Sequence, residues 1–412
     1  MPNTKEALIK YCFERDRLQA VRNIEQMNPA LAAEGLDFDL IRVSLSAKCP
    51  LLTAVFYNQI FAMSVATLQD KLTASGARLG NYRGAETPAS FGDTKAEFAA
   101  LLDGCAVFDL SWQAKLIFSG RDRVRWLNGM VTNNVRDLAL GHGVYSFVLT
   151  PQGHNQGDLV AYDRGDYLLV ATDREQAPKI TALLQRYIIM DDVEIEDISD
   201  KLSAIGVAGP KAGEVLSSAG IDVSQLQPGQ VIDTVRNEIG ISVARNTHPR
   251  MDGYEVWLAA EQADRVWDAL TSAGATPVGS DALEMYRIAR GVPRYGVDLR
   301  ERDLAQETGQ EHALSFIKGC YIGQEIVERV RARGNVHRTF IGFEVHGEPP
   351  PPGTKVRAND KDVGEITSAA RVPFPGGDRT LALGYLRREV ATAGTTVQVG
   401  EHSATVKTLP FI

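Results

Sequence analysis

The chain has 412 residues, which is too long for one ordinary hydrophobic core, so two or three domains are expected. Its composition, with 44% hydrophobic and 23% charged residues, excludes the fibrous and disordered classes. The net charge of −8 argues against a protein covered with nucleic acid over its whole surface, although it leaves room for a local basic stripe.

The cysteines and the first residues bear on the cellular compartment. Four cysteines lie far apart without a CxxC pair: Cys12, Cys49, Cys105 and Cys320. This spacing disfavours a disulfide scaffold and a structural zinc site, and it favours a reducing compartment. The first residues are polar, unlike those of a signal peptide. We therefore expect a cytoplasmic protein.

Residues 1–75 differ in character from the rest of the chain. A helix is expected over residues 5–26, followed by a polar link and an apolar segment over residues 50–68. Asn58 and Gln59 interrupt that segment, whereas a membrane span requires about 20 nearly unbroken apolar residues, so no membrane anchor is expected. An added regulatory helix is the second alternative. We favour the third, upstream sequence included through a misassigned start, because Met63 offers a natural start.

From residue 106 onward, short β patterns alternate with amphipathic helical patterns. Short apolar runs predict strands over residues 106–108, 115–118, 145–149, 158–162, 167–171 and 255–258. Apolar residues at helical spacing predict helices over residues 122–128, 175–190, 261–273 and 281–290, and around residues 326–330. Residues 337–412 combine strand patterns with a proline-rich turn, which is typical of a small β-barrel or sandwich.

The sharpest local motif is KGCYIGQE at residues 318–325, where two glycines bracket Cys320 just before a helical pattern. A thiol beside Lys318 and near a helix N-terminus experiences positive potential, which favours the reactive thiolate. The alternative is a small cysteine buried in the core, which is the commoner situation for a lone cysteine.

This motif, followed by Val330-Arg331 and residues 334–338, closely resembles the signature of the YgfZ proteins and their mitochondrial iron–sulfur assembly relatives. Residues 126–135, 252–256, 286–291, 364–368 and 382–385 resemble further stretches of that family or of the related glycine-cleavage T-proteins. The resemblance covers residues 80–412. It implies an α+β, aminomethyltransferase-like folate-binding fold with a C-terminal β-barrel. The implied division is an extension outside the family over 1–75, a T-protein-like region over 76–335 and a barrel over 336–412.

The resemblance also implies a ligand and a set of site residues. Tetrahydrofolate or a derivative would be the cofactor, and Cys320 would be the functional thiol, acting either as a redox-sensitive group or as a transient cluster ligand. The expected folate-binding residues are Asp158, Glu255, Arg287, Asn128 and Tyr321. Simpler roles compete with each assignment: an outward strand position for Glu255, a surface ion pair for Arg287, and ordinary core packing for Tyr321 and Trp126.

One departure from the T-protein pattern concerns catalysis. T-proteins carry two adjacent aspartates at a strand end, and the first is held to assist aminomethyl transfer; here Gly157 precedes Asp158. Glycine can neither accept a proton nor balance an iminium charge, so aminomethyltransferase activity is not expected. Nearby His154 is either a base or, more simply, a polar loop residue.

A dense basic run follows the cysteine motif and comprises Arg329, Arg331, Arg333, His337 and Arg338. Such a run is usually a solvated helix face, but it also suits a polyanion such as a polyglutamylated folate tail or RNA. The leading hypothesis is thus a folate-binding accessory protein that supports the assembly or repair of iron–sulfur clusters, and through them tRNA-modifying enzymes. The alternatives are a folate-dependent aminomethyltransferase and a nucleic-acid-binding module, so RNA stays open as a partner beside folate and iron–sulfur enzymes.

Overall fold

The computed structural model describes residues 68–334 and 336–412. The expectations for Cys12, Cys49, the helix over 5–26, the apolar segment before residue 68 and the start at Met63 lie outside the described residues. Within the described ranges, no helix is long and apolar enough to cross a membrane.

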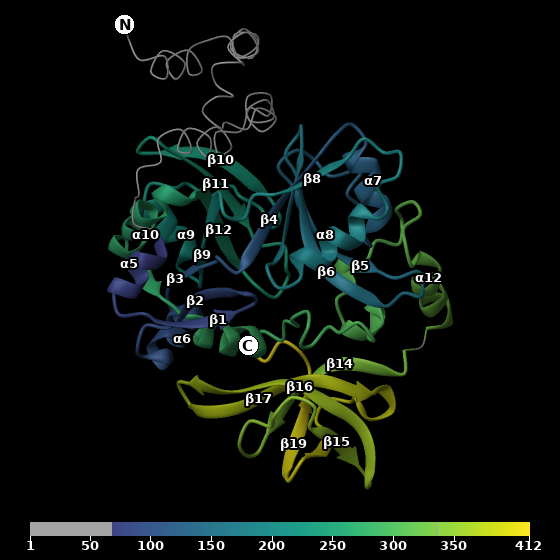
Figure 1. Ribbon diagram of the computed structural model, residues 1–412. Helices are drawn as coiled ribbons and strands as arrows, with labels where there is room; N and C mark the ends of the chain where they lie inside the picture. The colour runs from purple at the N-terminus through teal and green to yellow at the C-terminus, as the bar shows by residue number, and fades with distance from the viewer. Residues whose placement is uncertain (1–67, 335) are drawn as a thin grey trace, which may run out of the picture.

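Before the barrel, the described residues form two large β-sheets that pack side by side, each covered by helices on its outer side (Figure 1). The six-stranded sheet has the order β10 (Val231–Arg236), β11 (Ile239–Arg245), β12 (Gly253–Ala259), β9 (Leu202–Ala208), β3 (Ala106–Asp109) and β13 (Thr276–Pro277). The five-stranded sheet has the order β5 (Gly143–Leu149), β6 (Asn155–Asp163), β7 (Leu168–Asp173), β4 (Gln113–Ser119) and β8 (Glu194–Asp197). All pairs are antiparallel except β3 with β13.

Helices close the outer faces of these sheets because each carries an apolar stripe toward the strands. For example, α8 (Ala177–Gln185) buries Ala177, Ile180 and Leu184 against the five-stranded sheet. The other helices are α5 (Leu68–Ala74), α6 (Thr94–Asp103), α7 (Arg123–Met130), α9 (Ala212–Ser218), α10 (Ala263–Ser272), α11 (Ser280–Ala289) and α12 (Gln324–Arg333). A hairpin of β1 (Arg78–Tyr82) and β2 (Ala85–Ser90) precedes α6.

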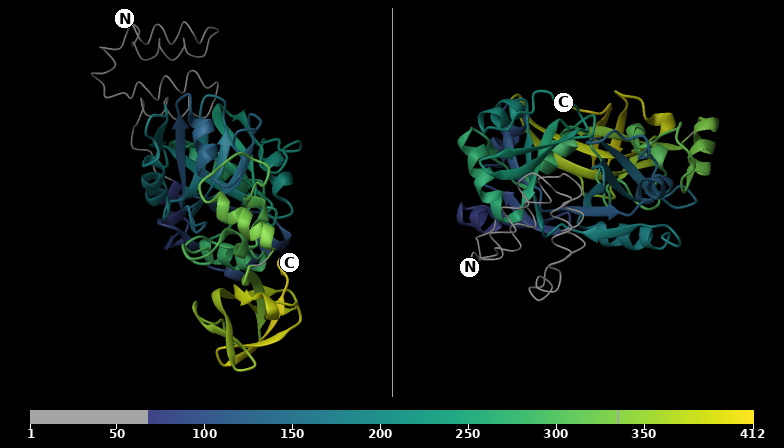
Figure 2. Two further views of the ribbon diagram at one scale, coloured as in Figure 1. Left: turned by 90° about the vertical axis from the view of Figure 1, so that its right-hand side faces the viewer. Right: turned by 90° about the horizontal axis from the view of Figure 1, so that it is seen from above.

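The C-terminal residues form a closed barrel at one end of the molecule (Figures 1 and 2). Its strands are β14 (Arg338–Val345), β15 (Lys355–Ala358), β16 (Lys361–Phe374), β17 (Gly377–Arg387), β18 (Thr396–Val399) and β19 (His402–Lys407). Closure pairs β14 with β19. The expected α+β fold with a C-terminal β-barrel is therefore confirmed.

One predicted helix is too long. The apolar spacing predicts a helix over 175–190, but α8 ends at Gln185, and Ile189 and Met190 are 83% and 94% exposed. The chain turns here to bring β8 beside β4, so these two apolar side chains have no core to enter.

Candidate functional site

A cavity of about 220 Å³ lies between the two sheets, where β6 and β7 face β9 and β12. Asp158 and Glu255 enter it from opposite sheets, and Arg287 borders it from α11. Its other walls are largely aromatic and apolar, from residues that include Tyr82, Phe108, Leu110, Trp112 and Val207. A flat, hydrogen-bonding ligand suits such a lining.

Asp158 is the best-placed proton acceptor of the cavity. Its Oδ2 accepts a hydrogen bond from the Tyr145 hydroxyl at 2.7 Å, and its Oδ1 accepts one from the Gln176 amide, also at 2.7 Å. Burial, reinforced by the negative charge of Asp173, raises the pKa of Asp158 to about 6. A carboxylate with a pKa near neutrality can take up and release a proton at physiological pH.

Gly157 faces the other way, which corrects the argument drawn from its lack of a carboxylate. Successive side chains of a strand point to opposite faces of the sheet. A Cβ added at Gly157 would lie 2.8 Å from Cδ1 of Ile180 and 3.0 Å from Oε1 of Gln176, under α8. A carboxylate at 157 would therefore point into the packing beneath α8, whereas Asp158 already supplies one to the cavity. The glycine does not speak against group-transfer chemistry.

Glu255, on the opposite sheet, is fixed by three donors. Its Oε1 accepts from Gln113 at 3.0 Å, and its Oε2 accepts from Lys115 at 3.2 Å and from the Trp257 indole at 2.8 Å. Burial alone would raise the pKa of Glu255, but the buried Lys115 ammonium and these hydrogen bonds outweigh it, so the pKa is lowered and the group is ionised. A carboxylate has about four acceptor positions, so one is left for a ligand.

Arg287 borders the cavity but serves the protein interior. The side chain is 2% exposed, so it does not form the surface ion pair considered above. Its five N–H groups donate to Glu284, twice, and to Asp298, the Val292 carbonyl and Ser368. Because every donor is used, a ligand carboxylate could bind Arg287 only by displacing one of these partners.

Three cavity residues hold unused donors. Among the described residues, the Trp112 indole nitrogen and the Nε atoms of Arg83 and Arg294 are buried without a hydrogen-bond partner. A buried donor without a partner costs free energy, about 1–3 kcal/mol. A ligand with acceptor atoms would satisfy these donors.

Sequence reasoning missed two histidines, His248 and His312, that contact the cavity residue Tyr145, because they come from segments distant in the chain. The His312 ring stacks on Tyr145 at 5.3 Å and meets His248 edge-on at 4.7 Å. Burial lowers the pKa of His248 to about 3 and of His312 to about 4, so both rings are neutral. No sequence motif contains these two histidines.

His154 does not line the cavity. Its backbone pairs with Thr150 and Leu304, as suits a polar loop residue.

The cysteine motif forms a separate feature beside α7, α12 and the edge strand β5 of the five-stranded sheet. Cys320 is exposed, whereas Lys318 is buried and donates to the carbonyls of Asn128, Val131 and Asn133 at 2.6–2.7 Å. Burial lowers the pKa of Lys318 to about 7. The ammonium thus anchors the loop to the end of α7, and its charge is directed at these carbonyls and not at the thiol. Among the described residues, no group of His, Cys, Asp and Glu side chains could hold a metal ion.

Two expected folate contacts belong to this loop region instead of the cavity. Asn128 is buried, and its Oδ1 accepts from the backbone N–H groups of Val135 and Arg136, so it braces the turn after α7. Tyr321 is 7% exposed and packs with Phe147 and other apolar residues. Neither lines the cavity, and both hold the cysteine loop in place.

The basic run is divided by the fold. Arg329 and Arg331 pair with Glu325 and Glu328 along α12, as in a solvated helix face. Arg338 turns inward and binds Asp303 and Glu307 at 2.8 and 2.9 Å. The side chain of Arg333 lies outside the described part of the chain.

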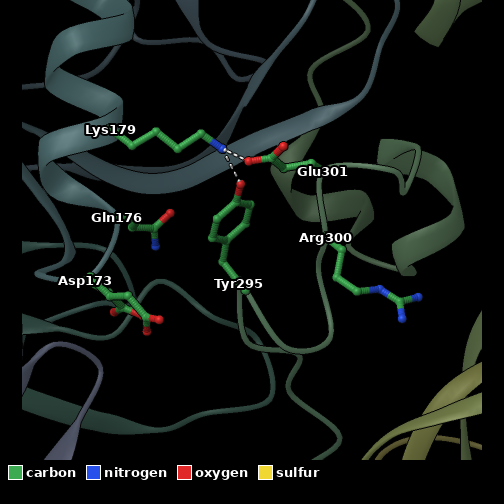
Figure 3. A pocket seen from close by; sticks show the side chains of 8 residues that line it. Asp173, Gln176, Lys179, Tyr295, Arg300 and Glu301 are labelled. Carbon is green, nitrogen blue, oxygen red and sulfur yellow. Dashed lines mark hydrogen bonds and ion pairs between the residues drawn. The ribbon is translucent and has the colours of Figure 1, made fainter. Parts of the chain in front are cut away.

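A second hollow, of about 270 Å³, adjoins the cavity and shares Asp173 and Tyr295 with it. Figure 3 shows Lys179 reaching between Tyr295 and Glu301; its ammonium donates to the Tyr295 hydroxyl at 2.9 Å. Gln176, the partner of Asp158, also lines this hollow. Arg300 points away from Lys179 (Figure 3).

Most of the described chain is similar to one family of known proteins. The GCVT N-terminal domain matches residues 68–318, and the glycine cleavage T-protein C-terminal barrel domain matches residues 338–412. An aminomethyltransferase of Rubrobacter xylanophilus is 30% identical over 348 residues, which cover 84% of this chain and 92% of that protein. A putative chloroplastic transferase of Arabidopsis thaliana is 28% identical, covering 83% of this chain and 79% of its own. The structure of glycine cleavage system aminomethyltransferase T from Bartonella henselae superposes with a TM-score of 0.76 at 20% identity, covering 85% of this chain and 98% of its own.

Proposed function

Because the chain belongs to the glycine cleavage T-protein family, we propose that it binds tetrahydrofolate in the central cavity and, as a YgfZ-type member, uses the thiol of Cys320 in the assembly or repair of iron–sulfur clusters. The observation that carries this proposal is the exposure of Cys320 on a loop anchored apart from the folate cavity. A partner protein or a cluster in transit can reach such a thiol while folate occupies the cavity.

The cavity fits a pterin head group. Glu255 and Asp158 offer acceptors to an aminopyrimidine edge, and Trp112, Arg83 and Arg294 offer the unused donors described above. Aromatic walls suit a flat heterocycle. A volume of about 220 Å³ is below the roughly 300–1,000 Å³ of pockets for whole drug-sized ligands, so the rest of the folate must extend beyond it. Bound tetrahydrofolate would supply a carrier for one-carbon groups.

Binding is tested by calorimetry with tetrahydrofolate. Glu255→Gln should weaken binding by about 1–3 kcal/mol, since a charged acceptor is lost. It also leaves Lys115 buried without a counter-ion, so the matched variant is the double change Lys115→Met with Glu255→Gln. If the wild type binds no tetrahydrofolate at millimolar ligand, the cavity assignment is wrong.

The thiol role is tested by complementation. In a strain lacking the gene, the activity of iron–sulfur enzymes should fall, and the wild-type chain should restore it. Cys320→Ser should fold normally, because the side chain is exposed, yet it should fail to restore activity. Cys105→Ser is the control for cysteine loss, since that thiol is buried and far from the loop in sequence. Full rescue by Cys320→Ser would overturn the thiol role.

Aminomethyl transfer is the second candidate, and one specific observation favours it. Asp158 faces the cavity with a pKa of about 6 and is oriented by Tyr145 and Gln176, as a proton-transferring carboxylate requires. The relatives named aminomethyltransferase are consistent with it. A glycine-cleavage assay with purified partner proteins distinguishes the candidates: activity abolished by Asp158→Asn and retained by Cys320→Ser would establish the transferase.

A further inference from the structure

A third hollow, of about 300 Å³, lies where the barrel meets the folate-binding region. Its rim carries basic side chains from three segments: Arg302 from the loop after α11, Lys355 from β15 and Arg387 from β17. These side chains are 57–60% exposed, so their charged ends are open to a ligand. The protein as a whole is acidic, which makes this local concentration of positive charge unusual for the chain.

Two carboxylates line the hollow: Asp362 pairs with Arg357, and Glu365 contacts the basic side chains around it. Glu365, 14% exposed, lies 2.6 Å from Arg302, 2.9 Å from Arg300, 3.7 Å from Lys355 and 4.0 Å from Arg338. Arg300 and Arg338 also share Asp303, and Arg338 binds Glu307 as well. The positive charges of Arg300 and Arg338 are therefore neutralised by neighbouring carboxylates. Among the described residues, Glu365 is the one acidic side chain that pairs with Arg302 and with Lys355, and they share it with Arg300 and Arg338. Arg387 lies 3.8 Å from Glu389.

The first two hollows adjoin each other, and Arg300 connects the second to the third. Asp173 and Tyr295 line both the central cavity and the second hollow. Arg300 lines the second hollow, whereas Glu365 and Tyr385 line the third. The Arg300 guanidinium binds Glu365 and lies over the Tyr385 ring, 5.3 Å from the ring centre. In Figure 3 the Arg300 side chain points from the second hollow toward the barrel. A ligand that begins in the central cavity would have to pass the Arg300 side chain to reach the barrel.

We propose that this junction hollow binds the anionic tail of a polyglutamylated folate whose pterin occupies the central cavity. The proposal rests on the proposed folate binding. Each γ-linked glutamate adds one carboxylate to the tail, and guanidinium groups match carboxylates in a two-bond geometry. Arg302 and Arg387 receive such carboxylates, with Lys355 as a third, point-like charge. Glu365 holds Arg302 and Lys355 at the hollow before the ligand arrives.

The tail should add measurable affinity without new pterin contacts. Exposed ion pairs contribute little individually, about 0.2–1 kcal/mol, but two or three in one cluster add up to roughly a tenfold change in Kd. The gain should shrink with added salt, because exposed charges are screened. The monoglutamate, which does not extend to the barrel, should bind with little dependence on these residues.

The test compares tetrahydrofolate monoglutamate with its triglutamate by calorimetry at low and high salt. The wild type should bind the triglutamate about tenfold more tightly at low salt. The double variant Arg302→Gln with Lys355→Gln should lose that preference and keep the monoglutamate affinity. Both side chains are mostly exposed, so the variant should fold. Arg371→Gln is the matched control, since Arg371 is an exposed barrel arginine paired with Glu348.

The outcomes separate this proposal from the one on which it rests. Equal wild-type affinity for the two folates would overturn the tail site and leave folate binding intact. Failure of both folates to bind would overturn folate binding and the tail site together. Binding of single-stranded RNA that the double variant loses, without any preference between the folates, would reassign the hollow to nucleic acid.

Discussion

At the scale of single residues, the cavity depends on which of two neighbours on β6 faces it. Asp158 points between the sheets, and Gly157 points beneath α8, where Ile180 leaves no room for a side chain. The position before the cavity carboxylate is thus limited by packing. In this chain a side chain at 157 would meet Ile180 and Gln176, so its absence removes no group from the cavity.

Gly157→Asp should destabilise the protein without creating transferase activity. The new Cβ would approach Ile180 to 2.8 Å, and overpacking of this kind costs about 1–3 kcal/mol, with a further cost for a buried charge. Urea denaturation measures the loss, and Gly157→Ala separates the steric part from the charge. The control is Gly376→Asp, because Gly376 has open space around it. Unchanged stability together with a gain in aminomethyl transfer would refute this account.

The carboxyl of Asp158 should make stability depend on pH. Its pKa is about 6 in the folded protein, against an ordinary value of 3.8, so the folded state holds the proton more tightly. Stability contributed by Asp158 is therefore full below about pH 4 and is lost as the pH rises through 6. As the pH rises from 4 to 7.5, the wild type should lose about 2–3 kcal/mol of its free energy of unfolding that Asp158→Asn, which lacks the titrating group, does not lose. Parallel pH profiles for the two proteins would contradict the shift.

The sequence pointed to Asp158 and Glu255 through a resemblance, and the structure brings both to one cavity. It could not reveal their partners, because Tyr145, Gln176 and Lys115 reach them from other elements through the tertiary fold. It placed Asn128 and Tyr321 with the folate, whereas these residues support the cysteine loop. Motif membership identifies residues that belong together, but only geometry separates a ligand contact from the support of a loop.

At the scale of elements, the cysteine loop is held by a buried lysine. Lys318→Met removes the donor for three carbonyls near the end of α7 and should lower the free energy of unfolding by about 2 kcal/mol. The freed loop should also let thiol reagents modify Cys320 faster. Lys201→Met is the control, because Lys201 makes a surface ion pair with Glu196 and should change stability by less than about 1 kcal/mol. Equal stability losses in the two variants would show that Lys318 is no anchor.

Helices and strands with a regular apolar pattern were predicted in the right places, but the residues at which they end were not predicted correctly. The predicted strands over 115–118 and 255–258 lie inside β4 and β12, where continuous apolar runs are buried between sheet and helix. The helix predicted over 175–190 is five residues too long at its C-terminal end, because Ile189 and Met190 continue the apolar pattern without entering the core. Composition cannot distinguish an apolar residue that packs from one that remains exposed.

At the scale of the whole molecule, a buried ion pair in the region before the barrel joins that region to β16 through hydrogen bonds. Arg287 of α11 binds Asp298 at 2.7 Å and Ser368 of β16 at 2.9 Å, and Asp298 also accepts hydrogen bonds from Thr367 and Ser368. Asp298 is 0% exposed. The two parts therefore share polar groups that neither could leave unpaired.

Arg287→Met should destabilise the protein by about 3–5 kcal/mol, because it leaves the buried charge of Asp298 uncompensated. Thermal unfolding followed by proteolysis at the junction would detect both the loss and the separation of the barrel. Arg371→Gln, which breaks only an exposed ion pair, should stay within about 0.5 kcal/mol of wild type. A loss for Arg287→Met as small as that of the control would mean that this buried cluster does not hold the barrel in place.

The overall architecture could be predicted from the family resemblance, but the three hollows could not be predicted from the sequence. The second and third hollows combine residues from α8, the loop after α11 and four barrel strands, which no local pattern links. Arg338 illustrates the difficulty: the sequence placed it in a basic run with Arg329, and the fold removes it to the junction.

The last residues of the chain have a practical consequence for handling this protein. The Phe411 N–H donates to the Ala289 carbonyl at 2.9 Å, and Phe411 and Ile412 pack against the apolar cluster shared by α6, α11 and the barrel. A purification handle or fluorescent reporter fused directly after Ile412 would pull against this seam. Fusions for imaging and affinity capture after Ile412 should instead be carried on a long flexible spacer.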